Sequence, residues 1–83
     1  MDAVDPTLLA QAERTALSVA GVQSARARGR WAGRSLRLDL QTGVDASMTV
    51  GASVSIVHAV EAAVFGAVGE ARVVEVHVTP RGK

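Results

Sequence analysis

VVEVHVTP, at residues 73–80, is the stretch that decides the fold class of this chain. Apolar and polar side chains alternate along it, as the two-residue period of a β-strand requires. The valines at positions 74, 76 and 78 point to one face. Glu75, His77 and Thr79 point to the other. A buried valine stripe needs a covering layer. We therefore expect a sheet with one covered face and one open, polar face that carries His77.

Residues 35–41, SLRLDLQ, repeat this alternation. Their leucines face inward, and Arg37, Asp39 and Gln41 face outward. The carboxylate of Asp39 and the imidazole of His77 can therefore share the polar face of one sheet. This pair is the strongest chemical lead in the sequence.

The residues before this strand predict a helix and an edge strand. Asp5 can cap a helix that begins at Pro6, and apolar residues recur every three or four positions toward a stop at Gly21. Residues 23–30 alternate arginine with alanine or glycine, which predicts an edge strand. A turn at residues 31–34 joins it to the leucine strand as a hairpin.

A second helix is predicted after a polar break at residues 43–47. Thr49 can cap this helix, and Gly69 ends it. Valines recur between them at helical spacing, at Val50, Val54, Val57, Val60, Val64 and Val68. The predicted order is therefore α-β-β-α-β, an α+β fold. Its last strand–helix–strand unit makes the second and third strands parallel, and both helices cover one face of a three-stranded mixed sheet.

Composition limits the functions open to the chain. With 83 residues and no cysteine, it is a single small domain without disulfides or thiolate metal sites. Its apolar share of 48% includes one Trp, one Phe and no Tyr, so the core consists of small side chains and would gain from dimerisation. A net charge of +1 argues against nucleic acid as a partner. The longest uncharged stretch, residues 46–60, is too short and polar to span a bilayer, which predicts a soluble intracellular domain.

Short motifs occur in a fixed order along nearly the whole chain: Asp5-Pro6, Gly21-Val22, Arg26-Ala27-Arg28, Ala32-Gly33, Val44-Asp45, Thr49-Val50 and Val76-His77-Val78-Thr79-Pro80. In these motifs residues 1–83 resemble the cytoplasmic C-terminal domain of the cation diffusion facilitator family of divalent-metal transporters, the zinc transporter dimerisation domain. The resemblance implies a ferredoxin-like or metallochaperone-like fold, a V-shaped homodimer and a regulatory role in the cytoplasm. It also implies the transporter's transmembrane domain as a partner, unless the chain is a free-standing homologue.

The resemblance implies metal ligands at Asp39 and His77. A third family ligand is a histidine early in the second helix, where this chain has Ser53-Val54, and a fourth is an aspartate at the position of Thr79. The family pattern thus implies a weakly bound divalent ion, zinc or another transition metal. The alternative is a hydrogen bond or ion pair between neighbouring strands.

Outside this pair, His58 lies one helical turn after Val54 and could replace the missing histidine, or could be an exposed histidine without metal. Five arginines surround Trp31: Arg26, Arg28, Arg30, Arg34 and Arg37. They could contact lipid headgroups, an acidic loop or nucleic acid, or they could keep an edge strand soluble. Trp31 could anchor an interface or fold back over the helices.

No nucleophile–base constellation, nucleotide-binding glycine loop or carboxylate pair for acid–base chemistry can be identified from the spacing. We therefore expect no enzyme activity. Two rival functions remain at this stage: a metal-independent module that docks a protein or membrane surface, and a small-ligand regulatory domain of similar strand order.

Overall fold

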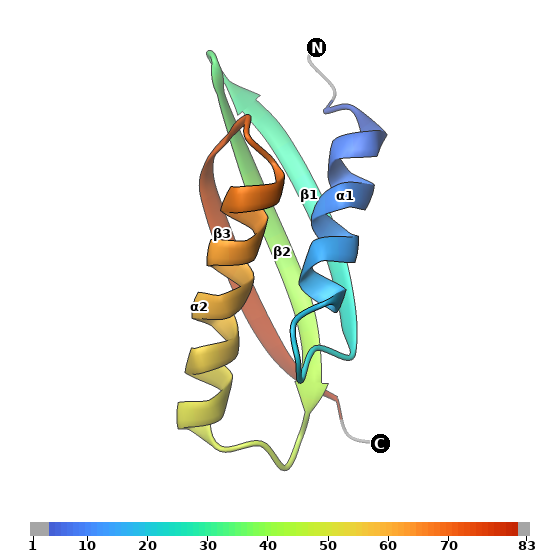
Figure 1. Cartoon of the computed structure of the whole chain (residues 1–83), viewed down its shortest axis with the longest axis vertical. Coiled ribbons are helices and arrows are strands. Elements are labelled where there is room, and N and C mark those ends of the chain that lie inside the picture. Colours follow the sequence, from blue (N-terminus) through green and yellow to red (C-terminus); the bar gives the residue numbers. More distant parts are fainter. Residues whose placement is uncertain (1–3, 82–83) are drawn as a thin grey trace.

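The computed structural model describes residues 4–81 and shows two helices lying side by side on one face of a three-stranded sheet (Figure 1). The elements are α1 (Pro6–Leu17), β1 (Ser24–Ala32), β2 (Ser35–Asp45), α2 (Val50–Ala67) and β3 (Ala71–Arg81). The predicted α-β-β-α-β order and α+β class are confirmed.

The sheet has the order β1-β2-β3. β1 and β2 pair antiparallel as a hairpin, and β2 pairs parallel with β3 through α2, as predicted. The alternation predicted for the middle strand is also confirmed, because Leu36, Leu38 and Leu40 are buried between the sheet and the helices. The opposite face of the sheet therefore has no covering layer within the described residues 4–81.

Helix α1 begins as predicted, with the Asp5 side chain accepting a hydrogen bond of 2.9 Å from the Thr7 N–H. The predicted stop at Gly21 is wrong, because the helix ends at Leu17 with Ser18 as its cap. Gly21 instead sits in the following turn with a φ of 95°, where a Cβ would lie 2.7 Å from the Ile56 side chain. Glycine meets both demands of that turn, the left-handed backbone and the close approach.

Helix α2 begins at its predicted cap, where the Thr49 hydroxyl accepts a hydrogen bond of 3.1 Å from the Ala52 N–H. The predicted inward stripe is wrong in its first half, since Val50 and Val54 are exposed. The buried residues are Ile56, Val60 and Val64, which recur every four positions. Val54 precedes Ile56 by two positions, roughly 200° around the helix, and so falls on the outward side.

The same helix is long and apolar enough by length and composition to cross a membrane, with a mean hydropathy of 1.6 over 18 residues. Residues 46–60 alone are too short to span a bilayer, but the helix continues to Ala67 and so reaches the required length. In the structure α2 packs one side against the sheet, and Phe65 and Val54 lie on its exposed side.

The strands are longer than predicted. β2 continues through the expected polar break to Asp45, β1 extends to Ala32, and β3 begins at Ala71. Backbone pairing explains the extension of β2, because Thr42 and Gly43 have partners on both neighbouring strands. Thr42 is also buried, and its hydroxyl donates a hydrogen bond of 3.0 Å to the carbonyl oxygen of His77.

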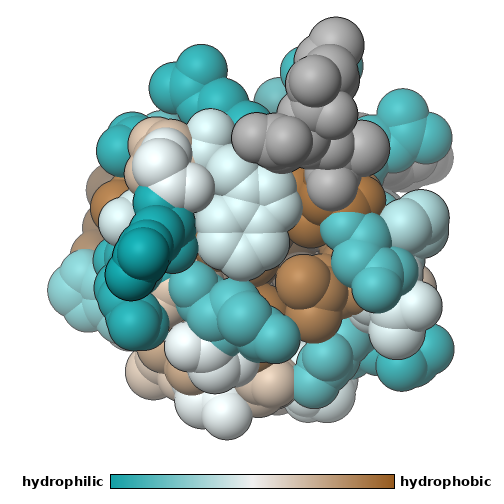
Figure 2. Space-filling view, turned by 90° about the horizontal axis from the view of Figure 1, so that it is seen from above, coloured by the Kyte–Doolittle hydropathy of each residue, from teal (hydrophilic) through white to brown (hydrophobic). Residues whose placement is uncertain are grey.

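The end of the molecule that carries the β1–β2 turn also carries the start of α1 (Figure 1). Viewed from this end, hydrophilic side chains form most of the rim, and hydrophobic side chains lie between them (Figure 2).

Candidate metal site

Three side chains with metal-ligand chemistry meet on the open face of the sheet. Asp39 comes from β2, and Glu75 and His77 come from β3. One donor atom from each lies within 4.8 Å of the other two, and all three residues are exposed. A nitrogen and two carboxylate oxygens at this spacing are donors that first-row divalent metals accept in proteins.

The strand register explains why these side chains converge. Asp39 is the direct partner of Glu75 in the parallel β2–β3 pair, and His77 is the next residue along β3 on the same face. The two strands are hydrogen-bonded neighbours, so the backbone alone brings the three positions together. The cluster is therefore a property of the sheet and needs no loop to assemble it.

A β-bulge sets which residues of β3 face the cluster. Between the pairs Leu36–Ala71 and Arg37–Val73, β3 carries one extra residue, Arg72. An extra residue shifts the two-residue alternation by one position. Ala71 and Val74 can therefore both be buried, and the side chains after them alternate so that Glu75 faces outward.

The structure places the two residues singled out from the sequence, Asp39 and His77, in the same cluster. Sequence reasoning missed Glu75 as a third member, although its outward orientation was visible in the alternation. The missing information was the register, which makes Glu75 the partner of Asp39. A short hairpin turn fixes the register of an antiparallel pair. The long crossover through a helix does not fix the register of a parallel pair, so the sequence alone does not give it.

The charges of the cluster are incompletely balanced. His77 Nε2 lies 4.0 Å from a Glu75 carboxylate oxygen, and about half of each side chain is exposed. Among the side chains of residues 4–80, this is the one ion pair within 4.0 Å, so none of their arginines reaches either carboxylate at that distance. Two carboxylates on neighbouring strands repel each other, and a cation between them would remove that repulsion.

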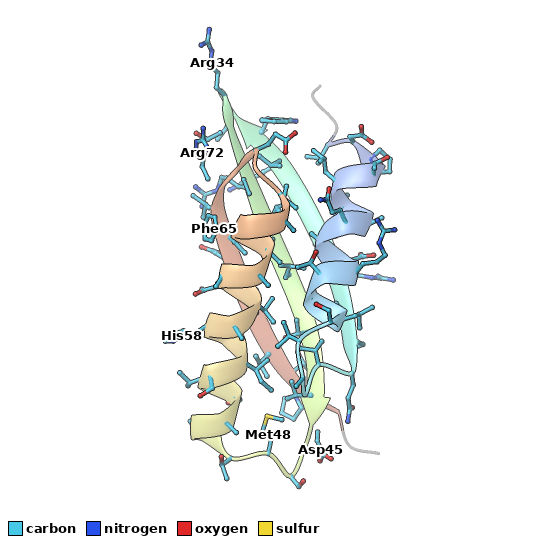
Figure 3. All side chains as sticks on the ribbon, in the orientation of Figure 1. Arg34, Asp45, Met48, His58, Phe65 and Arg72 are labelled. Atoms are coloured by element: carbon cyan, nitrogen blue, oxygen red, sulfur yellow. The ribbon has the colours of Figure 1, made fainter. Side chains whose placement is uncertain are left out.

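His58 is not part of this cluster. It lies on α2, which covers the other face of the sheet, and it projects outward from the helix (Figure 3). It is exposed, and no group of three possible ligands that includes it is found within residues 4–81. A role of His58 in metal binding stays a prediction that its position does not favour.

The arginines divide between the open face and the hairpin turn. Arg26, Arg28 and Arg30 are exposed on the open side of the edge strand β1, and Arg28 is the register partner of Asp39. Arg34 extends from the turn at the end of the molecule (Figure 3). Trp31 is partly buried and packs against the core, and its role as an interface anchor stays a prediction.

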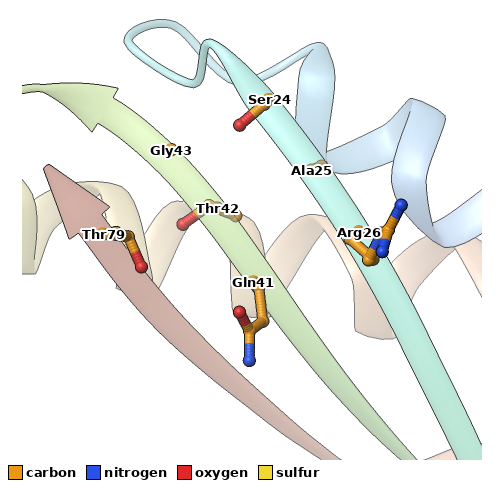
Figure 4. Close-up of a pocket in the computed structure, with 7 residues that line it drawn as sticks. All are labelled: Ser24, Ala25, Arg26, Gln41, Thr42, Gly43 and Thr79. Atoms are coloured by element: carbon orange, nitrogen blue, oxygen red, sulfur yellow. The ribbon is translucent and has the colours of Figure 1, made fainter. Parts of the chain in front are cut away.

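A hollow of about 400 Å³ adjoins the cluster toward the C-terminal end of β3 (Figure 4). It is lined by residues 24–26, 41–43 and Thr79. These lining residues include no carboxylate and no imidazole, so the hollow offers hydroxyl, amide and guanidinium groups beside the candidate metal site. Gln41, on its wall, is the register partner of His77.

The turn after β2 is stabilised by a carboxylate. Asp45 accepts hydrogen bonds of 2.8 Å from the backbone N–H of Ser47 and 2.8 Å from its hydroxyl. These two bonds, the backbone one first, lower the pKa of Asp45 below its usual value. The bonded turn leads from β2 into α2 and so fixes where the crossover helix begins.

Comparison with solved structures identifies the family. A methionine-to-leucine variant of the MamM C-terminal domain superposes with a TM-score of 0.87 and 30% sequence identity, over 92% of this chain and 96% of that one. MamM's C-terminal domain is a cytoplasmic domain of the cation diffusion facilitator family. This chain belongs to the same family of cytoplasmic C-terminal domains.

Further MamM structures agree. The MamM C-terminal domain itself matches with a TM-score of 0.87 and 28% identity, over 92% of this chain and 98% of that one. A nickel form of an aspartate-to-asparagine variant matches with a TM-score of 0.87 and 27% identity, over 93% of this chain and 99% of that one. Neither a family model nor a curated protein matches the chain. In this cation diffusion facilitator domain, the metallochaperone-like fold is thus established by structure.

Proposed function

We propose that this cation diffusion facilitator domain forms a homodimer in the cytoplasm and senses a divalent metal ion, zinc or a similar ion, through Asp39 and His77. The single observation that carries the proposal is the convergence of possible ligands on the open sheet face. Nickel forms among the solved MamM domains support a metal as the ligand class. The missing family ligands at Val54 and Thr79 make the expected binding weak.

The open face also suits a second copy of the chain. If a two-fold axis runs parallel to the strands between two open faces, β1 of one copy lies over β3 of the other. Arg28 then lies over the partner's Glu75, because these residues share one register row with Asp39. Opposite charges meet at both sides of the face, and the two Asp39 residues approach each other near the axis.

This geometry gives metal a regulatory effect. The two Asp39 carboxylates repel across the axis and favour an open dimer, while an ion bound at Asp39 and His77 lowers that repulsion and favours a closed one. The ion shifts an equilibrium that already exists between the two forms. A preference of only about 1.4 kcal/mol for the closed form changes the ratio of forms tenfold.

The proposal is tested by small-angle scattering and sedimentation of the metal-free protein with and without Zn²⁺. We expect Zn²⁺ to make the dimer more compact and the His77→Ala variant to show no such change. His58→Ala is the matched control, because it removes an exposed imidazole on the other side of the sheet. Equal scattering profiles with and without Zn²⁺ in the unmodified protein would contradict metal sensing.

A metal-independent interaction module is the second candidate. One observation favours it: α2 exposes Val50, Val54 and Phe65, with Val50 80% accessible. Large apolar side chains on a surface helix are typical of contacts with another protein or a membrane. In that case the domain would keep its association behaviour in the His77→Ala variant, with or without Zn²⁺.

A further inference from the structure

The family pattern leaves this chain with two of its four usual ligands, Asp39 and His77. Val54 stands where a helix histidine is expected and cannot bind metal, and Thr79 stands in place of an aspartate. Zinc usually takes four ligands, of which one or more can be water. On the family pattern alone, a usable site in this chain would need ligands from a second protomer.

We propose that Glu75 supplies the third ligand, so that Asp39, Glu75 and His77 of a single protomer hold the ion by themselves. This inference rests on the proposed metal-binding function. Glu75 occupies a position for which the family pattern implies no ligand. Its carboxylate lies beside both other donors, 4.0 Å from His77 Nε2 and within 4.8 Å of Asp39.

The distances allow one ion to reach all three donors. An ion at the centre of donors no more than 4.8 Å apart lies at most about 2.8 Å from each, against the 2.0–2.2 Å of zinc ligation. Less than one ångström of movement per side chain closes this gap. The side chains of Glu75 and His77 are 56% and 58% accessible, so rotamer changes are not blocked by packing.

Backbone and charge both favour this set of ligands. Asp39 and Glu75 are register partners on hydrogen-bonded strands, so the sheet holds their backbones together with or without an ion. No arginine nitrogen of residues 4–80 lies within 4.0 Å of these carboxylates. The two neighbouring carboxylates therefore favour a bound cation. His77 adds a nitrogen donor, which first-row transition metals bind more readily than Mg²⁺ or Ca²⁺ do.

The inference changes how binding depends on assembly. A site that bridges two protomers binds more tightly as the dimer forms, so its apparent affinity rises with protein concentration. A site complete in one protomer needs no partner, so one ion binds per chain even where the protein is monomeric. Its affinity rises with protein concentration only by as much as the bound ion favours the dimer. The dimer then responds to ions that are already bound, through the charge that each open face carries.

The test is calorimetric titration of Zn²⁺ into the metal-free protein, at two protein concentrations tenfold apart. We expect about one ion per chain at both concentrations. Glu75→Gln should weaken binding at least tenfold, and Asp39→Asn and His77→Ala should do the same. Glu70→Gln is the matched control, since it removes an exposed carboxylate from the turn before β3. Because all these residues are exposed, circular dichroism should show unchanged folding.

Each other outcome overturns the inference in a recognisable way. If Glu75→Gln binds like the unmodified protein while Asp39→Asn and His77→Ala lose binding, Glu75 is no ligand and the proposed function stands. If the titration ends at one ion per two chains, or if no ion binds where the protein is monomeric, the site spans two protomers. If Glu70→Gln and Glu75→Gln weaken binding equally, the effect is one of net charge. If the unmodified protein binds no Zn²⁺, the proposed function fails together with this inference.

Discussion

At the scale of single residues, Asp45 shows how a local hydrogen-bond pattern becomes a pH dependence. Its pKa is lowered by the backbone N–H and the hydroxyl of Ser47. A carboxyl with a lower pKa in the folded than in the unfolded chain stabilises the fold above the unfolded pKa. This contribution is lost as the pH falls through the lower, folded pKa. Acid should therefore loosen the turn between β2 and α2.

Ser47→Ala removes the hydroxyl donor but keeps the backbone N–H, so the pKa of Asp45 should rise part of the way toward its usual value. A pH titration of the Asp45 side-chain carbon by NMR measures this shift. Ser53→Ala serves as control, because the Ser53 hydroxyl donates to the carbonyl oxygen of Val50. An unchanged pKa of Asp45 in Ser47→Ala would show that the hydroxyl bond adds nothing.

At the scale of elements, a side chain of α1 completes the hydrogen bonding of the edge strand β1. A carboxylate oxygen of Glu13 accepts a bond of 2.8 Å from the backbone N–H of Ala27. Glu13→Ala leaves this partly buried N–H without that acceptor, and we expect a loss of about 1–3 kcal/mol in the free energy of unfolding. Glu13→Gln keeps an acceptor and should lose less.

Urea denaturation of the three proteins measures these differences. Glu70→Ala, at an exposed turn carboxylate, controls for the change in charge. If Glu13→Ala were as stable as Glu70→Ala, water would be an adequate substitute for the carboxylate at this edge.

The sequence predicted each element here but not all of their limits. Leucines and valines that alternate with polar residues predict a strand with one covered face. The presence of β2 and β3 could therefore be predicted from this pattern alone. The end of β2 did not, because Thr42 and Gly43 are poor strand residues by composition and are held there by pairing on both sides. Glu75 was missed for the same reason, since its partner Asp39 is set by the pairing of distant strands.

The buried side of α2 was also only half predicted. Six valines at helical spacing predict one stripe, but Ile56 lies in the core in place of the first two. A helix that is apolar around most of its circumference offers several possible stripes, and the neighbouring sheet selects one. Tertiary packing thus decided what periodicity left open.

At the scale of the whole molecule, the open face carries arginines on β1, Arg37 and Asp39 on β2, and Glu75 on β3. In the two-fold arrangement proposed above, Arg28 lies over the partner's Glu75. Arg28→Glu should therefore weaken dimerisation of the metal-free protein, by roughly tenfold at low ionic strength and less at high, because exposed charge pairs are screened by salt. Sedimentation velocity at two salt concentrations measures both effects.

Arg34→Glu is the matched control for this prediction. It makes the same change of charge at the hairpin turn, away from the open face (Figure 3). Equal effects of the two substitutions would point to net charge as the cause. A dimer unaffected by Arg28→Glu would place the contact between protomers elsewhere on the molecule.

The bulge at Arg72 has a consequence for how such a domain can change over generations. The turn after α2 is tight, with the Ala71 N–H donating to the carbonyl oxygen of Val68, and it delivers Ala71 into the core. The extra residue Arg72 shifts the inward–outward alternation of β3 by one position. Which residues of β3 face outward therefore does not depend on the packing of Ala71 after the helix. Exposed residues on the open face can therefore change one at a time, while the packing at the helix exit stays as it is.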